Sequence, residues 1–351
     1  MAQESHKGVV GIANVGNTCY ANSAIQLLRH CPEWSSFCLQ GLAEKEVQDE
    51  TTAPAKVMKG YMDILRPLWS GAKPAYIQPG GFWEMMRETV DGTIYEDFLR
   101  RIPHDAHEFI TWLLDQQFMA TQKPRDFNIL PPKNLDDADE MLAREAVKSW
   151  IDAFTKTYSP LTDLCFGLAL ATSTCQGCGA ESRTWETFNM LKVKPGAPHE
   201  DNSLQGMLKR ELQDECIEDF ACDKCKERCE VVRSHSIWRL PRNLFVVLKR
   251  FNHNGTKNQV PLSLDFNEEE DGGCVNFRES FSPKSPEASR NFKYTVFGTV
   301  DHHGHHMGGH YTAQGLNPLS KKWWVYDDET AYPLEEPKFG SSTYIIGFKS
   351  V

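Results

Sequence analysis

The chain has 351 residues with a net charge of −10, and 40% of its residues are hydrophobic. This composition is typical of a globular protein with one large domain or about two smaller ones. The acidic balance argues against nucleic acid as the main partner, because phosphate contacts need clustered Lys and Arg. No apolar stretch approaches the length of a membrane span, so we expect no membrane insertion.

The cysteine content and the N-terminus indicate where the protein acts. The chain contains 11 cysteines, an odd number, and its first residues contain no apolar signal region. A protein held together by disulfides would be shorter and its cysteines would be evenly paired. We therefore expect reduced cysteines and a location in the cytoplasm and/or the nucleus.

Helices dominate the predicted first part of the chain. Apolar residues recur at helical spacing over residues 21–28 and again over residues 109–113. Asp105 precedes the second of these helices at the position of a cap. The next two predicted elements are an exposed polar connection over residues 121–140 and a helix over residues 143–158.

The pattern changes after about Cys165, where short β-type runs alternate with Gly, Pro and Asn. Residues 267–291 are first acidic and then contain Ser and Pro, which predicts a mobile loop between strands. Helices followed by strands predict an α+β protein and not a parallel α/β fold. The expected strands cover residues 188–193, 236–240, 244–248, 294–300, 323–326 and 344–348.

A candidate nucleophile lies early in the chain. Cys19 follows a loop of Gly and Asn residues and stands in the first turn of a predicted helix. The positive end of the helix dipole favours the thiolate, which is the nucleophilic form of cysteine. Backbone N–H groups and Asn side chains of the preceding loop could stabilise an oxyanion. Alone, this pattern is weak evidence, because free cysteines are more often small buried hydrophobic residues.

Two later segments supply the partners that such a thiol needs. His310 follows two glycines, which let backbone and substrate approach closely. Imidazole is the usual base for a thiol. A carboxylate on the strand that ends in Asp327 and Asp328 could orient this imidazole and stabilise its charged form.

The histidine-rich run around this base permits two other interpretations. One is a metal site and the other is a solvated, glycine-rich loop. No carboxylate stands at zinc-ligand spacing within the run, and a bound metal would remove the free base that Cys19 needs. We therefore favour the base. The histidines of the run are His302, His303, His305, His306 and His310.

Two Cys-x-x-Cys pairs predict a structural zinc ion. Pairs of this kind on tight turns form a tetrahedral thiolate cage, and four thiolates leave no open coordination position. Cys229 lies near enough to be a substitute ligand. The predicted ligands are Cys175, Cys178, Cys222 and Cys225. The cysteines expected to have no chemical role are Cys31, Cys38, Cys165, Cys216 and Cys274.

Four motifs occur in order along the chain. They are GNTCYANSAIQLL around Cys19, PHDAHEFITWLLD over residues 103–115, LPRNLFVVLKRF over residues 240–251, and VFGTVDHHGHHMGGHYTA with WWVYDDETA around His310. They resemble the Cys box, the second box, the strand motif and the His box of ubiquitin-specific proteases, which are papain-like cysteine peptidases. The matches run from residue 11 to residue 349, so the resemblance covers essentially the whole chain.

The resemblance implies a papain-like cysteine protease fold with a helical thumb, a β-rich palm and zinc-ribbon-like fingers. A single catalytic domain would cover residues 8–350. Its parts would be the thumb over about residues 8–165, the fingers over about 166–235 and the palm over about 236–350. Ubiquitin would sit in the palm, and its C-terminal tail would reach Cys19 between thumb and palm.

The resemblance also implies roles for single residues. Asn14 matches the family's oxyanion-hole asparagine. Asp327 matches the third member of a triad with Cys19 and His310, and Asp328 is its backup. The residues expected to contact the substrate are Asp105, Glu108, His302, Gly309 and Tyr311, the two carboxylates through basic side chains of the ubiquitin tail.

Some features of the resemblance stay open. Asp105 could simply cap its helix while Glu108 is solvated. Pro103 stands where the family usually has Gln, and Ala21 stands where Met is commonest.

The expected activity is hydrolysis of the isopeptide or peptide bond after the C-terminal glycine of ubiquitin. The alternatives are a catalytically weak ubiquitin-binding scaffold and a protease for another ubiquitin-like modifier.

Overall fold

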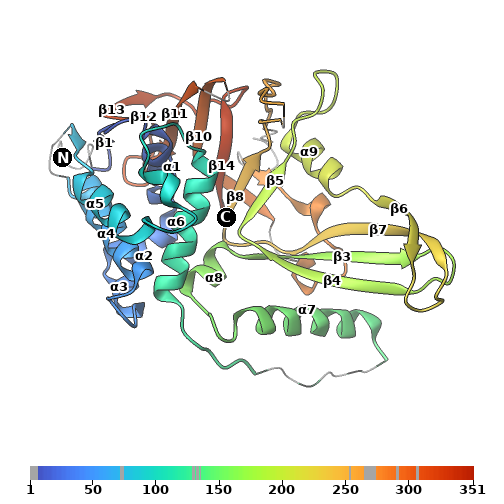
Figure 1. The fold of residues 1–351 in the computed structure, drawn as a ribbon. Helices are drawn as coiled ribbons and strands as arrows, with labels where there is room; N and C mark the ends of the chain where they lie inside the picture. The colour runs from blue at the N-terminus through green and yellow to red at the C-terminus, as the bar shows by residue number, and fades with distance from the viewer. Residues whose placement is uncertain are drawn as a thin grey trace.

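The computed structural model of this chain combines helices in its first half with two large sheets in its second half (Figure 1). The predicted α+β class is therefore confirmed. Within the part of the chain that is described, no helix is both long and apolar enough to cross a membrane. The described residues are 7–71, 75–128, 131, 134, 136–252, 254–264, 274–289, 292–305 and 308–351.

Helix α1 (Cys19–Arg29) lies between the helical part and the larger sheet, and all of its residues are buried. It packs against α6 (Ala106–Thr121) on one side and against strand β11 (Gly308–Leu316) on the other. The helices expected over residues 21–28 and 109–113 are therefore present, within longer elements. The other helices of this part are α2 (Pro32–Leu39), α3 (Leu42–Glu46), α4 (Ala53–Trp69), α5 (Gly80–Val90), η2 (Glu96–Leu99) and α8 (Pro160–Cys165).

Helix α7 (Ala138–Phe154) begins and ends earlier than the helix predicted over residues 143–158. Asp137 is its N-cap and accepts hydrogen bonds from the N–H groups of Asp139 and Glu140. This cap starts the helix inside the stretch that the sequence predicts to be an exposed connection. The helix runs alongside strands β3 and β4 (Figure 1) and contacts β4.

The larger sheet carries the C-terminal part of the chain and has the order β13-β12-β11-β10-β14-β8-β5, with β9 paired to β10. Its pairings are antiparallel except that of β5 with β8, which is parallel. All residues of β8 are buried, because the strand lies between two covered faces. The strands not yet given are β5 (Met190–Val193), β8 (Asn243–Leu248), β9 (Val275–Asn276), β10 (Lys293–His305), β12 (Trp323–Asp327), β13 (Thr330–Leu334) and β14 (Thr343–Ser350).

The smaller sheet has the order β4-β3-β7-β6, and its long strands extend away from the rest of the molecule (Figure 1). Most residues of β4 and β6 are exposed. Their polar sequences lack the alternation that predicts a half-buried strand, so the sequence indicates neither of them. The elements of this region are β3 (Gly167–Cys175), β4 (Glu181–Phe188), α9 (Leu204–Glu211), β6 (Glu215–Ala221) and β7 (Arg228–Arg239), and a two-residue pair joins β1 (Gly11–Ile12) to β2 (Tyr76–Ile77) elsewhere.

The mobile loop predicted over residues 267–291 is wrong for the residues that are described there, 274–289. Strand β9 pairs with β10, and two short helices follow, η3 (Arg278–Ser280) and η4 (Pro286–Ser289). Phe277 and Phe281 are buried in the core below the larger sheet. These two aromatic residues fix the segment, although its polar composition hides them. Residues 265–273 and 290–291 lie outside the described residues.

A buried arginine fastens two loops to the end of strand β8. The side chain of Arg250 is fully buried and donates hydrogen bonds to the carbonyl oxygens of Thr343, Asn258, Val260 and Gly340 at 2.6 to 3.1 Å. A planar guanidinium with five donors suits several carbonyl groups at once. The contact holds the segment after β8 against the start of β14.

Replacing this arginine should strongly destabilise the fold. Arg250→Met should lower the free energy of unfolding by about 3 kcal/mol or more, because it removes a buried donor from four carbonyl groups, of which that of Thr343 is buried and the others are partly buried. Arg242→Met is the matched control, since Arg242 is exposed, and it should change stability by less than about 0.5 kcal/mol. Urea unfolding of both variants measures the difference. Equal stability of the two variants would contradict the role of Arg250.

Candidate active site

Cys19 is the first residue of helix α1, and its side chain is buried at 7% exposure. Burial raises the pKa of the Cys19 thiol, the N–H of Tyr311 lowers it, and the negative charge of Asp328 raises it again. The net result is a pKa above the ordinary value, in spite of the favourable helix terminus. The thiol therefore needs a base to become a nucleophile.

His310 lies on β11 and Asp327 at the end of the neighbouring strand β12. The His310 Nε2 atom is 2.6 Å from Asp327 Oδ1, and both side chains are about two-fifths exposed. This contact orients the ring and leaves Nδ1 for a proton from a thiol. The structure thus brings together the two residues that the sequence assigns to base and orienting acid.

Asp328 connects the strand end to the loop before Cys19. Its two carboxylate oxygens accept hydrogen bonds from Asn14 Nδ2 and Asn22 Nδ2, each at 2.8 Å. Burial raises the pKa of Asp328, and these two hydrogen bonds act in the opposite direction. The backbone carbonyl of Asp328 also accepts the N–H of Ile12 at 2.8 Å. Asp328 is therefore committed to Asn14 and Asn22.

Two residues of this connection are absent from the sequence analysis, Asn22 and Glu329. Asn22 lies three residues after Cys19 on the same helix face, which is a spacing that could have indicated it. Glu329 accepts a hydrogen bond from the backbone N–H of Asn14 at 2.7 Å. Glu329 directly follows the two aspartates, but no pattern in the sequence shows that it faces Asn14. Both side chains help to position the nucleophile loop.

Asn14 shapes the loop that leads to the nucleophile. Its Oδ1 atom accepts hydrogen bonds from the N–H groups of Gly16 and Thr18, at 3.0 and 3.1 Å. A primary amide has two N–H bonds, and Asp328 accepts one of those of Asn14. The other N–H is left for a further acceptor.

The thiol and the imidazole are not yet engaged with each other. Among the hydrogen bonds of the described residues, none joins the Cys19 thiol to His310. Catalytic hydrogen bonds are often long in substrate-free proteins and tighten when substrate binds. The raised pKa of Cys19 fits this resting arrangement.

The predicted substrate contacts at helix α6 lie in two different environments. Asp105 is the N-cap of α6 and accepts the N–H of His107 at 2.7 Å. Its two oxygens also accept the hydroxyl of Tyr344, at 2.8 and 2.7 Å. Glu108 is exposed on the first turn of the same helix. Asp105 thus has structural partners, and Glu108 is open to solvent.

The other predicted contact residues gather where β10 and β11 pair. His302 is buried and packs against Tyr311 and Phe251, with ring centroids 4.6 and 5.1 Å apart. A side chain at Gly309 would collide with the His302 ring, so glycine permits this packing. Tyr311 is buried, and burial raises the pKa of its hydroxyl. His302 and Tyr311 occupy paired positions of β10 and β11, and the backbone N–H of Tyr311 acts on the Cys19 thiol.

The histidine run is a strand pair and not one solvated loop. His302, His303 and His305 belong to β10, and His310 belongs to β11. The His303 ring lies 3.4 Å from the Thr312 hydroxyl. His306 lies outside the described residues. The ligand atoms of His310, Asp327 and Asp328 are within 4.8 Å of one another, but the hydrogen bonds given above already engage all three.

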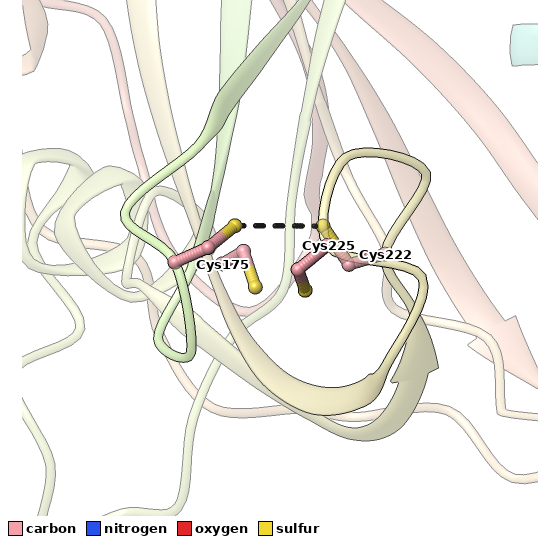
Figure 2. A group of neighbouring side chains, drawn as sticks. Cys175, Cys222 and Cys225 are labelled. Carbon is pink, nitrogen blue, oxygen red and sulfur yellow. Dashed lines mark hydrogen bonds between the residues drawn. The ribbon is translucent and has the colours of Figure 1, made fainter.

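The four predicted ligand cysteines lie together at the tip of the smaller sheet. Their sulfur atoms are within 4.8 Å of one another, and Figure 2 shows Cys175, Cys222 and Cys225 directed toward a common centre. Backbone N–H groups, chiefly that of Cys178, lower the pKa of Cys175 to about 6. Such amide groups stabilise the thiolates that a metal needs. The donor set therefore fits a metal ion.

Comparison with known proteins places the chain among ubiquitin hydrolases. The family profile described as "Ubiquitin carboxyl-terminal hydrolase" matches residues 10–347. Ubiquitin carboxyl-terminal hydrolase 2 of Rattus norvegicus is 24% identical over 99% of this chain and 55% of its own length. Ubiquitin carboxyl-terminal hydrolase 4 of Vanderwaltozyma polyspora is 28% identical over 93% of this chain and 39% of its own length.

A solved structure has the same fold. A chain of the SAGA Ubp8/Sgf11/Sus1/Sgf73 DUB module bound to ubiquitin aldehyde aligns with a TM-score of 0.72 at 18% identity. The alignment covers 99% of this chain and 70% of that one. This chain spans about half the length of the curated rat relative. The family match over residues 10–347 shows that the chain belongs to the ubiquitin carboxyl-terminal hydrolase family.

Proposed function

We propose that this chain is a thiol-dependent deubiquitinase that cleaves the bond after the C-terminal glycine of ubiquitin. One observation carries the proposal. The carboxylate of Asp328 accepts hydrogen bonds from Asn14 and Asn22, and so joins the loop and helix of Cys19 to the strand end that carries Asp327. The names of the relatives supply the substrate class, and the solved neighbour is described as bound to ubiquitin aldehyde.

The chemistry follows from the side chains of the site. His310 takes the proton of the Cys19 thiol, and the sulfur attacks the carbonyl carbon of the terminal glycine. Asn14 donates its remaining amide N–H to the oxyanion. His310 then gives its proton to the leaving amine, and water attacks the thioester with the same ring as base. Asp327 holds the ring in position and stabilises its charged form.

Recognition of the tail would use residues of the β10–β11 strand pair and of helix α6. His302, Gly309 and Tyr311 form the sheet side, and Glu108 offers an exposed carboxylate on the helix side. An exposed carboxylate can hold a basic side chain of the ubiquitin tail by charge-assisted hydrogen bonds. The hydroxyl of Tyr344 and the α6 cap already engage Asp105, so Asp105 contributes less to this recognition.

The four-cysteine cluster would hold one zinc ion as a structural centre. Its four thiolates fill a tetrahedral shell, so the ion would stabilise the tip of the smaller sheet and take no part in bond cleavage. None of the eleven cysteines, all of which lie among the described residues, is in a disulfide. This supports a reducing compartment, the cytoplasm and/or the nucleus, as the place of action.

The first test removes the nucleophile. Cys19→Ser should lower cleavage of a fluorogenic ubiquitin C-terminal amide by several orders of magnitude, because a serine hydroxyl is a far weaker nucleophile here. The unfolding midpoint should stay close to that of the unchanged protein. Cleavage at the original rate would refute the mechanism. An unchanged protein that binds ubiquitin but never cleaves it would be a scaffold. A protein that cleaves only a probe based on another ubiquitin-like modifier would be a protease for that modifier.

The second test compares substitutions of Asp327, Asp328 and Asn14. Asp327→Ala should lower turnover more than Asp328→Ala, because only Asp327 contacts the imidazole. Asn14→Ala should lower turnover by roughly a hundredfold with little change in ubiquitin affinity. Steady-state kinetics measure the turnover, and ubiquitin binding to variants that also carry Cys19→Ser measures the affinity. A larger loss for Asp328→Ala would transfer the orienting role to Asp328.

The third test concerns Glu108 and Asp105. Glu108→Lys should weaken ubiquitin binding at least tenfold (about 1.4 kcal/mol), since it replaces an attraction for a basic tail with a repulsion. Asp105→Asn should have a smaller effect, because Asn also caps helices. The exposed Glu84 on α5 provides the matched control Glu84→Lys. Equal affinities for Glu108→Lys and Glu84→Lys would remove Glu108 from the recognition site.

The fourth test concerns the metal. Purified protein should contain one equivalent of zinc, and changing both Cys175 and Cys222 to Ser should abolish it. Elemental analysis measures the content, and thermal unfolding should show a lower midpoint for the double variant. Metal content that does not respond to the double change would show that these cysteines have only a packing role.

A further inference from the structure

A fifth thiol lies beside the four-cysteine cluster. The sulfur atoms of Cys229 and Cys225 are 3.9 Å apart, which matches the 3.8 Å between the predicted ligands Cys178 and Cys222. Cys229 is therefore as close to Cys225 as two members of the cluster are to each other, although only the four predicted ligands all lie within 4.8 Å of one another. The sequence spacing already indicates Cys229 as a substitute, and the structure shows which ligand it approaches.

The strand register places this thiol at the cluster. Cys175 pairs with Val231 across antiparallel strands β3 and β7, and the N–H of Gln176 continues the pairing to the carbonyl of Glu230 at 2.9 Å. One residue further along the two segments, Cys229 lies next to Gly177. A Cβ atom at Gly177 would lie 2.6 Å from the Cys229 sulfur and 3.7 Å from the Cys175 sulfur.

The glycine therefore makes room for the Cys229 sulfur, whereas the Cys175 sulfur would be at an ordinary contact distance from a side chain there. With any side chain at Gly177, Cys229 would have to move from its place. A cysteine that served only as packing would not need this close approach to the cluster.

The five thiols differ in how firmly they are held. Cys175 and Cys222 are buried, with 3% and 7% exposure. Cys225 and Cys229 are both partly exposed and lie on adjoining segments of one turn. Cys178 is exposed, so exposure alone does not single out one ligand, and the 3.9 Å approach of the Cys229 sulfur is what points to Cys225. Cys216 is exposed on β6 and does not belong to the cluster.

We propose that Cys229 is an exchange ligand of the metal centre that can replace Cys225, so that five thiols serve four coordination positions. This inference rests on the zinc site proposed above. In the exchange, the sulfur of Cys229 forms a bond to the metal as its thiol releases a proton, and the Cys225–metal bond breaks as that thiolate takes up a proton. The metal keeps four thiolates and its charge does not change.

The consequence is a centre that tolerates the loss of one particular thiol. Removing Cys175, Cys178 or Cys222 leaves no thiol in the right place, whereas removing Cys225 leaves Cys229 to complete the shell.

Single and double variants of the full chain test the exchange. Cys225→Ser and Cys229→Ser should each keep one zinc, and after cobalt substitution each should show the thiolate-to-cobalt absorption of four thiolates. The double variant should lose one thiolate from this spectrum and bind zinc more weakly by over about tenfold. Cys178→Ser should behave like the double variant, and Cys216→Ser should behave like the unchanged protein.

The outcomes separate this inference from the zinc proposal. If Cys225→Ser already shows the three-thiolate spectrum and the weaker binding of the double variant, Cys229 is not a ligand and the inference fails, while the four-cysteine site stands. If the unchanged protein binds no zinc or cobalt under reducing conditions, the zinc proposal fails and the inference fails with it.

A measurement on the unchanged protein avoids any folding defect of the variants. Brief alkylation of the zinc-loaded protein with iodoacetamide, followed by peptide mass mapping, should label Cys216, which is exposed outside the cluster, and, within the cluster, either Cys225 or Cys229. Protein that carries one label within the cluster should retain its metal. Label on Cys229 alone, with Cys225 always protected, would identify Cys225 as a fixed ligand and overturn the exchange.

Discussion

The whole site depends on one carboxylate, that of Asp328. It accepts hydrogen bonds from Asn14 and Asn22, which belong to the loop and helix of the nucleophile, and Asp328 itself follows the last residue of β12. Residues more than 300 positions apart are thereby held in one place. Because a half-buried carboxylate loses much of its hydration, leaving it without these donors would be costly. The helical part and the larger sheet are joined where the chemistry takes place.

The same carboxylate opposes the ionisation of Cys19. Burial of the sulfur raises the pKa of the Cys19 thiol, and the negative charge of Asp328 acts in the same direction. In the proposed mechanism, activation comes from His310, whose Nε2 atom lies 2.6 Å from Asp327. The two neighbouring aspartates thus have different contacts. Asp328 binds the loop and helix of Cys19, and Asp327 binds the imidazole of His310. In the proposed mechanism, binding of the substrate tail would complete the contact between the Cys19 thiol and His310.

The sequence indicates the residues proposed to carry the chemistry, but not the residues that position them. Cys19, His310 and Asp327 belong to motifs whose residue types the chemistry dictates. Asn22 was missed, since an asparagine inside a helix is an ordinary residue until its partner is known. Tyr344 was missed in the same way, because it contacts Asp105 from 239 positions away.

The fold shows a similar division. The buried strand β8 follows from its apolar run, whereas the exposed strands β4 and β6 have polar sequences without alternation. Strands β4 and β6 form through their pairing partners and the cysteine cluster at the tip of the sheet. These are contacts between distant segments, which the local sequence does not show. The fixed segment with Phe277 and Phe281 was mistaken for a mobile loop for the same reason.

The central claim is that Cys19 attacks the C-terminal carbonyl of ubiquitin with His310 as its base. Reaction with ubiquitin that carries a C-terminal electrophile, followed by peptide mass mapping, tests it most directly. The account predicts one covalent adduct, on Cys19 among the eleven cysteines, and much slower labelling in His310→Ala. An adduct on another cysteine, or no adduct in a folded protein, would contradict it.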